Sequence, residues 1–156
     1  DWLINVMWDS ERGVFYTLYD VEVGERVPFK EHGNPECVNS RVAFGLFSAY
    51  EETENSRYLE CATDTLDWVI DTQANVVVTD HGVQAYFAKP TVYGNHIIVA
   101  SLAEAYKVTG EAKYLAFATA AADWIIDQMD APFTGFESNA WTVVEGLEAL
   151  LALLAL

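Results

Sequence analysis

Two stretches of this 156-residue chain, residues 39–71 and 95–127, repeat each other at a constant offset of 56 positions. The matching residues keep their spacing through an apolar run, a short turn and a second run. They are Asn39 and Asn95, Ala49-Tyr50 and Ala105-Tyr106, Tyr58-Leu59 and Tyr114-Leu115, Ala62-Thr63 and Ala118-Thr119, and Asp67-Trp68 and Asp123-Trp124. An offset that stays fixed across two helical patterns and their turn is the signature of a repeated supersecondary unit. The repeat therefore predicts an all-α chain built from helical hairpins.

Each repeat is expected to hold an inner helix followed by an outer helix. The predicted helices cover residues 39–52, 57–72, 95–108 and 112–128. The inner runs are apolar around most of their circumference, which is typical of helices that are buried on most sides. The outer runs carry acidic residues along one face, so we expect them to lie on the outside of the molecule.

An asparagine opens each inner run. Asn39, Asn95 and Asn139 occupy the same place in two complete copies and in a third that begins at residue 139. Asparagine is favoured at helix N-caps because its side chain accepts a hydrogen bond from an unpaired backbone N–H. We therefore expect each of the three to cap an inner helix.

The connections between helices are short at one end of the hairpins and long at the other. Residues 5–38 and 73–93 form the long connections, and each contains a glycine-aromatic element and a short strand pattern, at 21–27 and at 76–78. Connections of this length are typical of functional loops. A solenoid of helix pairs and a closed ring of pairs both fit the alternation, and the closed ring also explains the apolar inner helices.

The two ends of the chain match interrupted repeats. Residues 1–4 match the end of an outer helix, and residues 139–156 match the beginning of an inner one. We therefore expect residues 1–156 to form one partial domain of a longer protein.

The charge of the chain excludes some partners. It has 24 acidic and 8 basic residues, for a formal net charge of −16. No basic stripe is present to neutralise phosphates, which argues against nucleic acid and against an anionic membrane surface. The acid excess fits either a solvated surface that maintains solubility or a cytoplasm of high salt. Because no run of about 18 apolar residues occurs and only Cys37 and Cys61 are present, we expect no membrane span, no disulfide framework and a cytoplasmic location.

Common cofactor motifs are absent from the sequence. It contains no Walker A loop, no GxGxxG, no HExxH and no nucleophile elbow. The spacing of cysteine and histidine does not form a zinc-binding set. We therefore expect neither a nucleotide cofactor nor a bound metal.

The positions that follow the shared asparagines differ between copies, whereas scaffold residues are expected to repeat. Arg41 stands where the second copy has Ile97, and a guanidinium suits bidentate binding of a carboxylate or of paired hydroxyls. His96 can act as a general base or can orient a ligand. The alternatives are a surface Arg41 that pairs with Glu36 and a His96 with a structural role.

Residues of the long loops are expected to complete a site at the mouth where the inner helices begin. Asp80 and Glu137 are the acids expected to share proton transfer with His96, because glycosidases work with paired carboxylates. The aromatic side chains expected to stack on the apolar faces of a sugar are Trp8, Tyr16, Tyr86 and Trp141. The alternative for these aromatic residues is that they close the mouth as core.

The motifs of the second repeat are Ala105-Tyr106, Thr109-Gly110-Glu111, Lys113-Tyr114-Leu115 and Asp123-Trp124-Ile125-Ile126. The first repeat carries the same motifs with Asn55-Ser56 in place of the glycine. With glycine-aromatic loops between the copies, the pattern resembles the (α/α)6 toroid, or six-hairpin glycosidase-like, superfamily over nearly the whole chain. The resemblance implies about half of a helical toroid, with short β-hairpins in its loops.

The resemblance also implies a carbohydrate-active enzyme that acts on a sugar or a uronic acid, either a glycoside hydrolase or a sugar epimerase or isomerase. Asn39-Ser40-Arg41 and Gly13-Val14-Phe15-Tyr16 resemble two motifs of the N-acylglucosamine 2-epimerases, in which the arginine binds substrate. Those enzymes have an acidic residue after the histidine, where this chain has Ile97. The alternative is a non-catalytic helical-repeat module that binds carbohydrate or protein.

Overall fold

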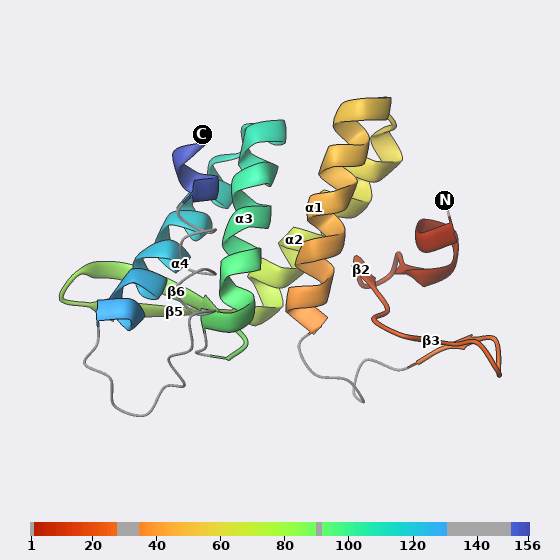
Figure 1. Ribbon diagram of the computed structural model, residues 1–156, viewed down its shortest axis with the longest axis horizontal. Helices are drawn as coiled ribbons and strands as arrows, with labels where there is room; N and C mark the ends of the chain where they lie inside the picture. Colours follow the sequence, from red (N-terminus) through yellow and green to blue (C-terminus); the bar gives the residue numbers. More distant parts are fainter. Residues whose placement is uncertain (1, 28–34, 90–91, 131–150) are drawn as a thin grey trace.

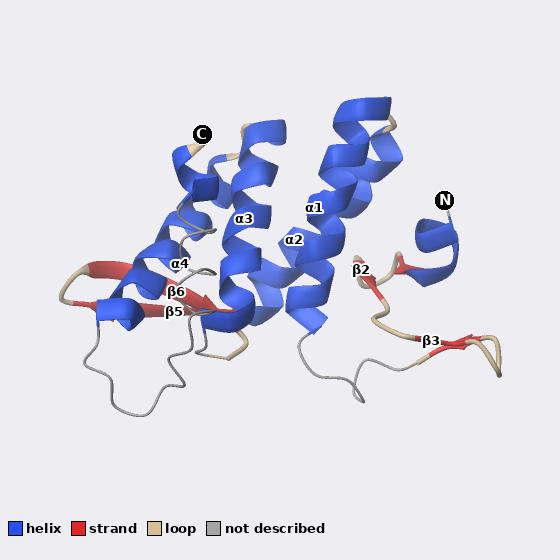
Figure 2. Cartoon of the chain, viewed as in Figure 1, coloured by secondary structure: helices blue, strands red, loops and turns tan. Residues whose placement is uncertain are grey.

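The computed structural model describes residues 2–27, 35–89, 92–130 and 151–156, and helices dominate this part of the chain (Figures 1 and 2). The elements in chain order are η1 (Leu3–Met7), β1 (Trp8–Asp9), β2 (Val14–Phe15), β3 (Tyr19–Asp20), β4 (Glu25–Arg26), α1 (Pro35–Thr53), α2 (Ser56–Gln73), β5 (Ala74–Thr79), β6 (Gly82–Phe87), α3 (Val92–Thr109) and α4 (Ala112–Asp130). A β-hairpin, an inner helix and an outer helix recur in that order, as β1–β2–α1–α2 and as β5–β6–α3–α4. The predicted fold, repeated helical hairpins with β-hairpins in the connections, is confirmed.

The inner helices α1 and α3 lie side by side and run in the same direction (Figure 1). The Ser101 hydroxyl of α3 donates a buried hydrogen bond of 2.8 Å to the backbone carbonyl of Ser40 in α1. Closer to the helix starts, a Cβ at Gly94 would lie 3.6 Å from the Cβ of Cys37. The N-termini of both inner helices therefore meet at one end of the molecule.

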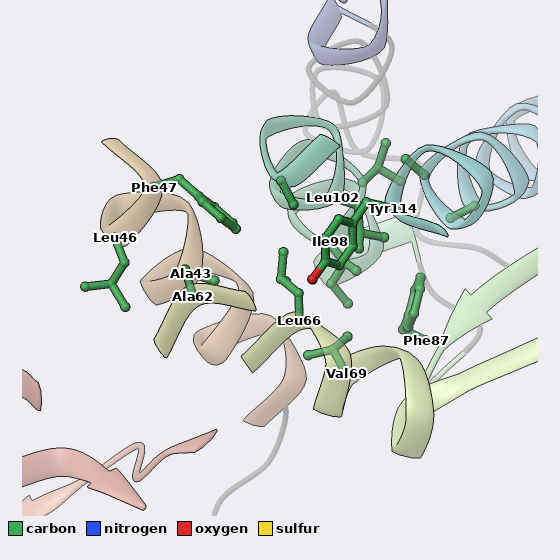
Figure 3. Close-up of a cluster of buried hydrophobic side chains, with 14 of the residues drawn as sticks. Ala43, Leu46, Phe47, Ala62, Leu66, Val69, Phe87, Ile98, Leu102 and Tyr114 are labelled. Atoms are coloured by element: carbon green, nitrogen blue, oxygen red, sulfur yellow. The ribbon is translucent and has the colours of Figure 1, made fainter. Parts of the chain in front are cut away.

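The hydrophobic core fills the space between inner and outer helices (Figure 3). Leu66 and Val69 of α2 face Ile98 of α3 and Tyr114 of α4, and all four side chains are fully buried. Apolar residues three or four positions apart share one face of a helix, so each helix presents a continuous stripe to this core. Burial of one such side chain contributes about 1.5–3 kcal/mol.

The short turns of the two repeats have the same geometry. Glu54 and Gly110 both adopt a left-handed backbone, with φ values of 52° and 72°. Their N–H groups donate to the carbonyls of Tyr50 and Tyr106, both at 2.7 Å, and so end the inner helices. The expectation that Asn55-Ser56 replaces the glycine is wrong, because Glu54 occupies the position of Gly110. Glycine takes this conformation without the steric cost that a Cβ incurs.

The predicted N-caps Asn39 and Asn95 are also wrong. Helix α1 begins at Pro35 and α3 at Val92, so both asparagines lie inside the first turns, and both are buried. Proline is favoured at the first helical position because its missing N–H is not needed there. The asparagine that caps a helix is Asn55, whose side chain accepts from the Arg57 N–H at 3.1 Å before α2.

The inner helices are not equally buried. Helix α3 buries Val99 and Leu102 completely, whereas α1 leaves Val38 and Phe44 exposed, with Phe44 at 41%. The prediction that α1 is buried on most sides is therefore wrong. Among the described residues, α2 and α3 cover only part of the circumference of α1. Helix α2 is amphipathic as predicted, with Glu60 exposed. None of the described helices is both long and apolar enough to span a bilayer.

The hairpin predicted around Gly24 and the strand predicted at residues 76–78 are both confirmed, and the strand is longer than predicted. Strands β3 and β4 pair Tyr19 with Arg26, around the pattern predicted at 21–27. Strands β5 and β6 pair from Ala74 opposite Phe87 to Thr79 opposite Gly82. At the beginning of the described chain η1 is a π-helical segment, where the end of an outer helix was expected. The predicted third inner helix lies mostly outside the described residues.

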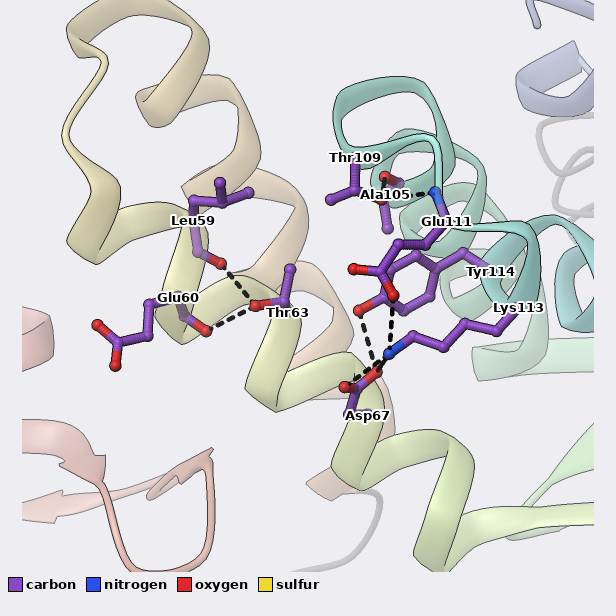
Figure 4. A network of polar contacts seen from close by, with 9 residues as sticks. All are labelled: Leu59, Glu60, Thr63, Asp67, Ala105, Thr109, Glu111, Lys113 and Tyr114. Carbon is purple, nitrogen blue, oxygen red and sulfur yellow. Dashed lines mark hydrogen bonds and ion pairs between the residues drawn. The ribbon is translucent and has the colours of Figure 1, made fainter.

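A polar contact joins the outer helices of the two repeats (Figure 4). Asp67 of α2 accepts a hydrogen bond of 3.0 Å from the Tyr114 hydroxyl and forms an ion pair of 2.8 Å with Lys113. Lys113 and Tyr114 both lie at the start of α4. Lys113 also pairs with Glu111 at 3.1 Å. Because Asp67 belongs to one repeat and Lys113 and Tyr114 to the next, these contacts fix how the repeats stack.

Candidate functional site

The mouth, defined here as the starts of α1 and α3 with the ends of β2 and β6, is the place where the sequence predicts a site. Two asparagines build it. Asn39 Oδ1 accepts the Phe15 N–H and Asn95 Oδ1 accepts the Phe87 N–H, both at 2.7 Å. Helix α1 therefore holds the end of β2, and helix α3 holds the end of β6.

His96 lies in the second turn of α3 at this mouth and is 4% exposed. Its Nδ1 is 3.4 Å from the backbone carbonyl of Val92. A carbonyl only accepts hydrogen bonds, so in this contact the histidine ring is the donor. The burial of His96 and its contact with its own helix support the structural alternative.

Arg41 is exposed on the side of α1 that its described neighbours do not cover. Glu36, one turn earlier, is buried at 7% exposure. Within the described part of the chain no ion pair joins Arg41 to Glu36, which was the alternative role for Arg41. Arg41 and the buried Glu36 therefore both lie near the start of α1, and His96 lies near the start of the neighbouring helix α3.

Trp8 and Tyr16 are brought together by the hairpin β1–β2. The ring of Trp8 packs against Phe15 with centroids 4.7 Å apart, and the Tyr16 N–H donates to the Met7 carbonyl at 2.9 Å. The Arg26 guanidinium lies over the Tyr16 ring at 5.1 Å and reaches the Trp8 carbonyl at 3.5 Å. Trp8 and Tyr16 are partly buried against the hydrophobic core, which fits the alternative that these aromatic residues close the mouth.

Asp80 lies at the opposite end of the β5–β6 hairpin from the mouth. It is in the exposed turn after Thr79, and a six-residue strand separates it from Phe87, roughly 20 Å. Tyr86, near the strand end, packs against Trp124 of α4 with centroids 5.5 Å apart. The structure therefore brings Tyr86, but not Asp80, towards the start of α3.

The turn that contains Asp80 is attached to α4 through Asp127. Asp127 accepts hydrogen bonds from Gln84 Nε2 at 2.6 Å and from the His81 ring at 2.9 Å. The Gln84 hydrogen bond and then the His81 contact lower the pKa of the Asp127 carboxyl. His81 thus pairs with a carboxylate of α4, and not with its neighbour Asp80.

Glu137 and Trp141 lie outside the described residues. The described residues line two hollows, one of about 480 Å³ beside Tyr19 and Arg26 and one of about 320 Å³ between Arg12 and Asp67. Among the described residues no three His, Cys, Asp or Glu side chains converge as metal ligands.

Two features of the mouth were missed from the sequence. Arg26 was not selected, although the alternation around Gly24 predicts a hairpin that returns the chain towards Tyr16. The contacts of Asn39 and Asn95 with strand ends were also missed. The available signal was that Asn39 and Asn95 repeat at the offset of 56.

The family model of the β-L-arabinofuranosidase GH127 catalytic domain matches residues 35–142, which include α1, α2, α3 and α4. No curated protein matches the chain. The match supports a glycoside hydrolase, and it gives no support to the epimerase or isomerase alternative. The chain therefore belongs to the GH127 catalytic-domain family of glycoside hydrolases, within the six-hairpin (α/α)6 toroid superfamily.

Proposed function

We propose that the protein is a glycoside hydrolase that releases β-L-arabinofuranosyl groups from a glycan. The observation that carries this proposal is the family match over residues 35–142, because the matched segment contains both inner helices and the end of β6. The substrate is then a carbohydrate. The aromatic residues of the long loops also favour a carbohydrate, and the sequence has no basic stripe that would favour nucleic acid.

Arg41 is proposed to bind hydroxyls of the sugar, and His96 to move a proton. Arg41 is exposed on α1, and the buried His96 lies on the neighbouring helix α3. The stacking surface is proposed to consist of Trp8 and Tyr16, which belong to the same hairpin, together with Tyr86 and Trp141. Asp80 and Glu137 remain the carboxylates proposed for proton transfer. Glu137 is the preferred candidate, because Asp80 is distant from the mouth.

The direct test uses p-nitrophenyl β-L-arabinofuranoside with the purified protein, and the α-L-arabinofuranoside and β-D-galactopyranoside as matched substrates. We expect p-nitrophenol release from the first substrate to exceed release from the other two. Proton NMR of free L-arabinose in the same protein solution tests for an isomerase. Binding of the glycoside without turnover indicates the non-catalytic module. Folded protein that hydrolyses none of the three glycosides contradicts the proposed substrate.

The residue roles are tested by Arg41→Ala and His96→Gln. We expect Arg41→Ala to raise KM at least about tenfold, because a charge-assisted hydrogen bond is worth about 1.5–3 kcal/mol, with unchanged thermal stability since Arg41 is exposed. We expect His96→Gln to lower kcat by about 10²-fold or more, as loss of a general base does. Unchanged kinetics in either folded variant removes that residue from the site.

A further inference from the structure

Asn39 and Asn95 hold their strands in the same way. Besides the two equal bonds from the phenylalanine N–H groups, Asn39 Nδ2 donates to the Phe15 carbonyl at 3.1 Å and Asn95 Nδ2 donates to the Lys89 carbonyl at 3.1 Å. Both amides therefore accept from a strand end and donate to a backbone carbonyl at or just after it. Here each such set of contacts is called an Asn clamp.

The residue that follows each strand end is held by the residue just before the paired strand. Tyr16, after Phe15, donates its N–H to the carbonyl of Met7, the last residue of η1, at 2.9 Å, and Ala88, after Phe87, donates to the carbonyl of Gln73, the last residue of α2, at 2.8 Å. Phe15 and Phe87 are each 1% exposed. Both strand ends are thus held by a backbone hydrogen bond and by an Asn clamp, and the buried N–H groups of Phe15 and Phe87 are satisfied.

The loops that the two Asn clamps span have very different lengths. Phe15 and Asn39 are 24 positions apart, whereas Phe87 and Asn95 are 8 apart, and the longer loop contains β3 and β4. The contacts of the two asparagines nevertheless agree in distance. The strand ends are therefore held independently of what the loop between strand and helix contains.

We propose that Asn39 and Asn95 are positioning residues of the active site, a role that rests on the proposed function. Each Asn clamp joins a strand end to the first turns of an inner helix. The Asn95 clamp thereby sets Tyr86 relative to His96, and the Asn39 clamp sets Tyr16 relative to Arg41. A displacement of about 1 Å at such a site is enough to lower a rate substantially.

The two repeats supply comparable variants, Asn39→Ala and Asn95→Ala, because each removes the acceptor of a strand-end N–H, although Asn39→Ala also removes a hydrogen bond of 2.9 Å to the Pro35 carbonyl. Hydrogen exchange is measured first, and we expect faster exchange at Phe15 and Tyr16 in Asn39→Ala and at Phe87 and Ala88 in Asn95→Ala. Asn95→Asp keeps the acceptor oxygen but loses the donor to Lys89, so protection of the Phe87 amide should be retained. Thr65→Ala, which removes a buried hydroxyl bond of 2.7 Å within α2, controls for loss of stability alone.

Kinetics with the arabinofuranoside then separate positioning from stability. We expect Asn95→Ala to lower kcat about tenfold or more with KM little changed, and Asn39→Ala to raise KM about tenfold, while Thr65→Ala leaves both constants unchanged per folded molecule. Equal losses of kcat and no change in KM in both asparagine variants overturn the proposal, as does exchange that rises uniformly over the chain.

If the wild-type protein is inactive on this substrate, the proposed function fails. The exchange pattern still decides the proposal: localised exchange supports it, and unchanged or uniform exchange overturns it.

Discussion

Glu54 has a side chain on a backbone conformation that favours glycine. Its φ of 52° places a residue with a Cβ in the left-handed region, where the second repeat has Gly110. A non-glycine residue in this region costs about 1–2 kcal/mol, and the greater freedom of glycine in the unfolded chain offsets part of that cost. We predict that Glu54→Gly raises the free energy of unfolding by about 1 kcal/mol, as measured by urea denaturation.

The matched variant for this prediction is Gly110→Ala, at the equivalent position with a φ of 72°. It should lower stability by about 1 kcal/mol, since no Cβ is tolerated there without strain. Equal stability of wild type and Glu54→Gly would mean that Glu54 makes a compensating interaction in the folded protein.

We expect the buried thiol of Cys61 to make the stability of the protein sensitive to alkaline pH. Cys61 is 3% exposed, and burial raises its pKa to about 11 from 9.0, although the nearby Arg57 opposes the shift. The folded state therefore retains a proton that the unfolded state releases, so the contribution is present below pH 9 and is lost as pH rises through about 11. We predict that the melting temperature falls more steeply between pH 9 and pH 11 in the wild type than in Cys61→Ala. Parallel pH curves for the two proteins would contradict this account.

At the scale of elements, the stacking of α2 on α4 depends more on Tyr114 than on Lys113. Both donate to Asp67, but Tyr114 is fully buried, whereas the side chain of Lys113 is 41% exposed. A buried hydrogen bond to a charged acceptor contributes about 1.5–3 kcal/mol, and an exposed ion pair contributes about 0–1 kcal/mol. We predict that Tyr114→Phe lowers the free energy of unfolding by more than about 1 kcal/mol and that Lys113→Met lowers it by less.

Denaturant titration of the two single variants and of their combination with Asp67→Asn measures this difference. In the Asp67→Asn background the cost of Tyr114→Phe should shrink, because the charged acceptor is gone. A larger effect of Lys113→Met than of Tyr114→Phe would show that the ion pair, and not the buried hydroxyl, joins the repeats.

At the scale of the whole molecule, the net charge of −16 acts against compaction. Acidic residues face solvent along the outer helices, and salt screens their mutual repulsion over a Debye length of about 10 Å at 0.1 M. We predict that the melting temperature rises between 10 mM and 1 M NaCl. Sucrose at equal osmolality controls for general stabilisation, and a melting temperature that stays constant or falls with salt contradicts a significant role for repulsion.

The repeat of 56 residues was enough to predict the helical hairpins, their turns and the amphipathic outer helices. These features depend on the periodicity of neighbouring residues and on the chemistry of short turns, which are local properties of the chain. The family resemblance also followed from these local motifs. The proposed residues Arg41 and His96 were found in the same way, as positions at which one copy departs from the other.

Contacts between distant segments were decided only by the tertiary structure. Asn39 and Asn95 were predicted to cap helices, whereas packing of the hairpins against α1 and α3 gives them the strand ends of Phe15 and Phe87 as partners. The same packing carries Asp80 away from His96. An asparagine side chain has the same hydrogen-bonding capacity at a cap and at a strand end, so only the position of the neighbouring backbone determines which role it takes.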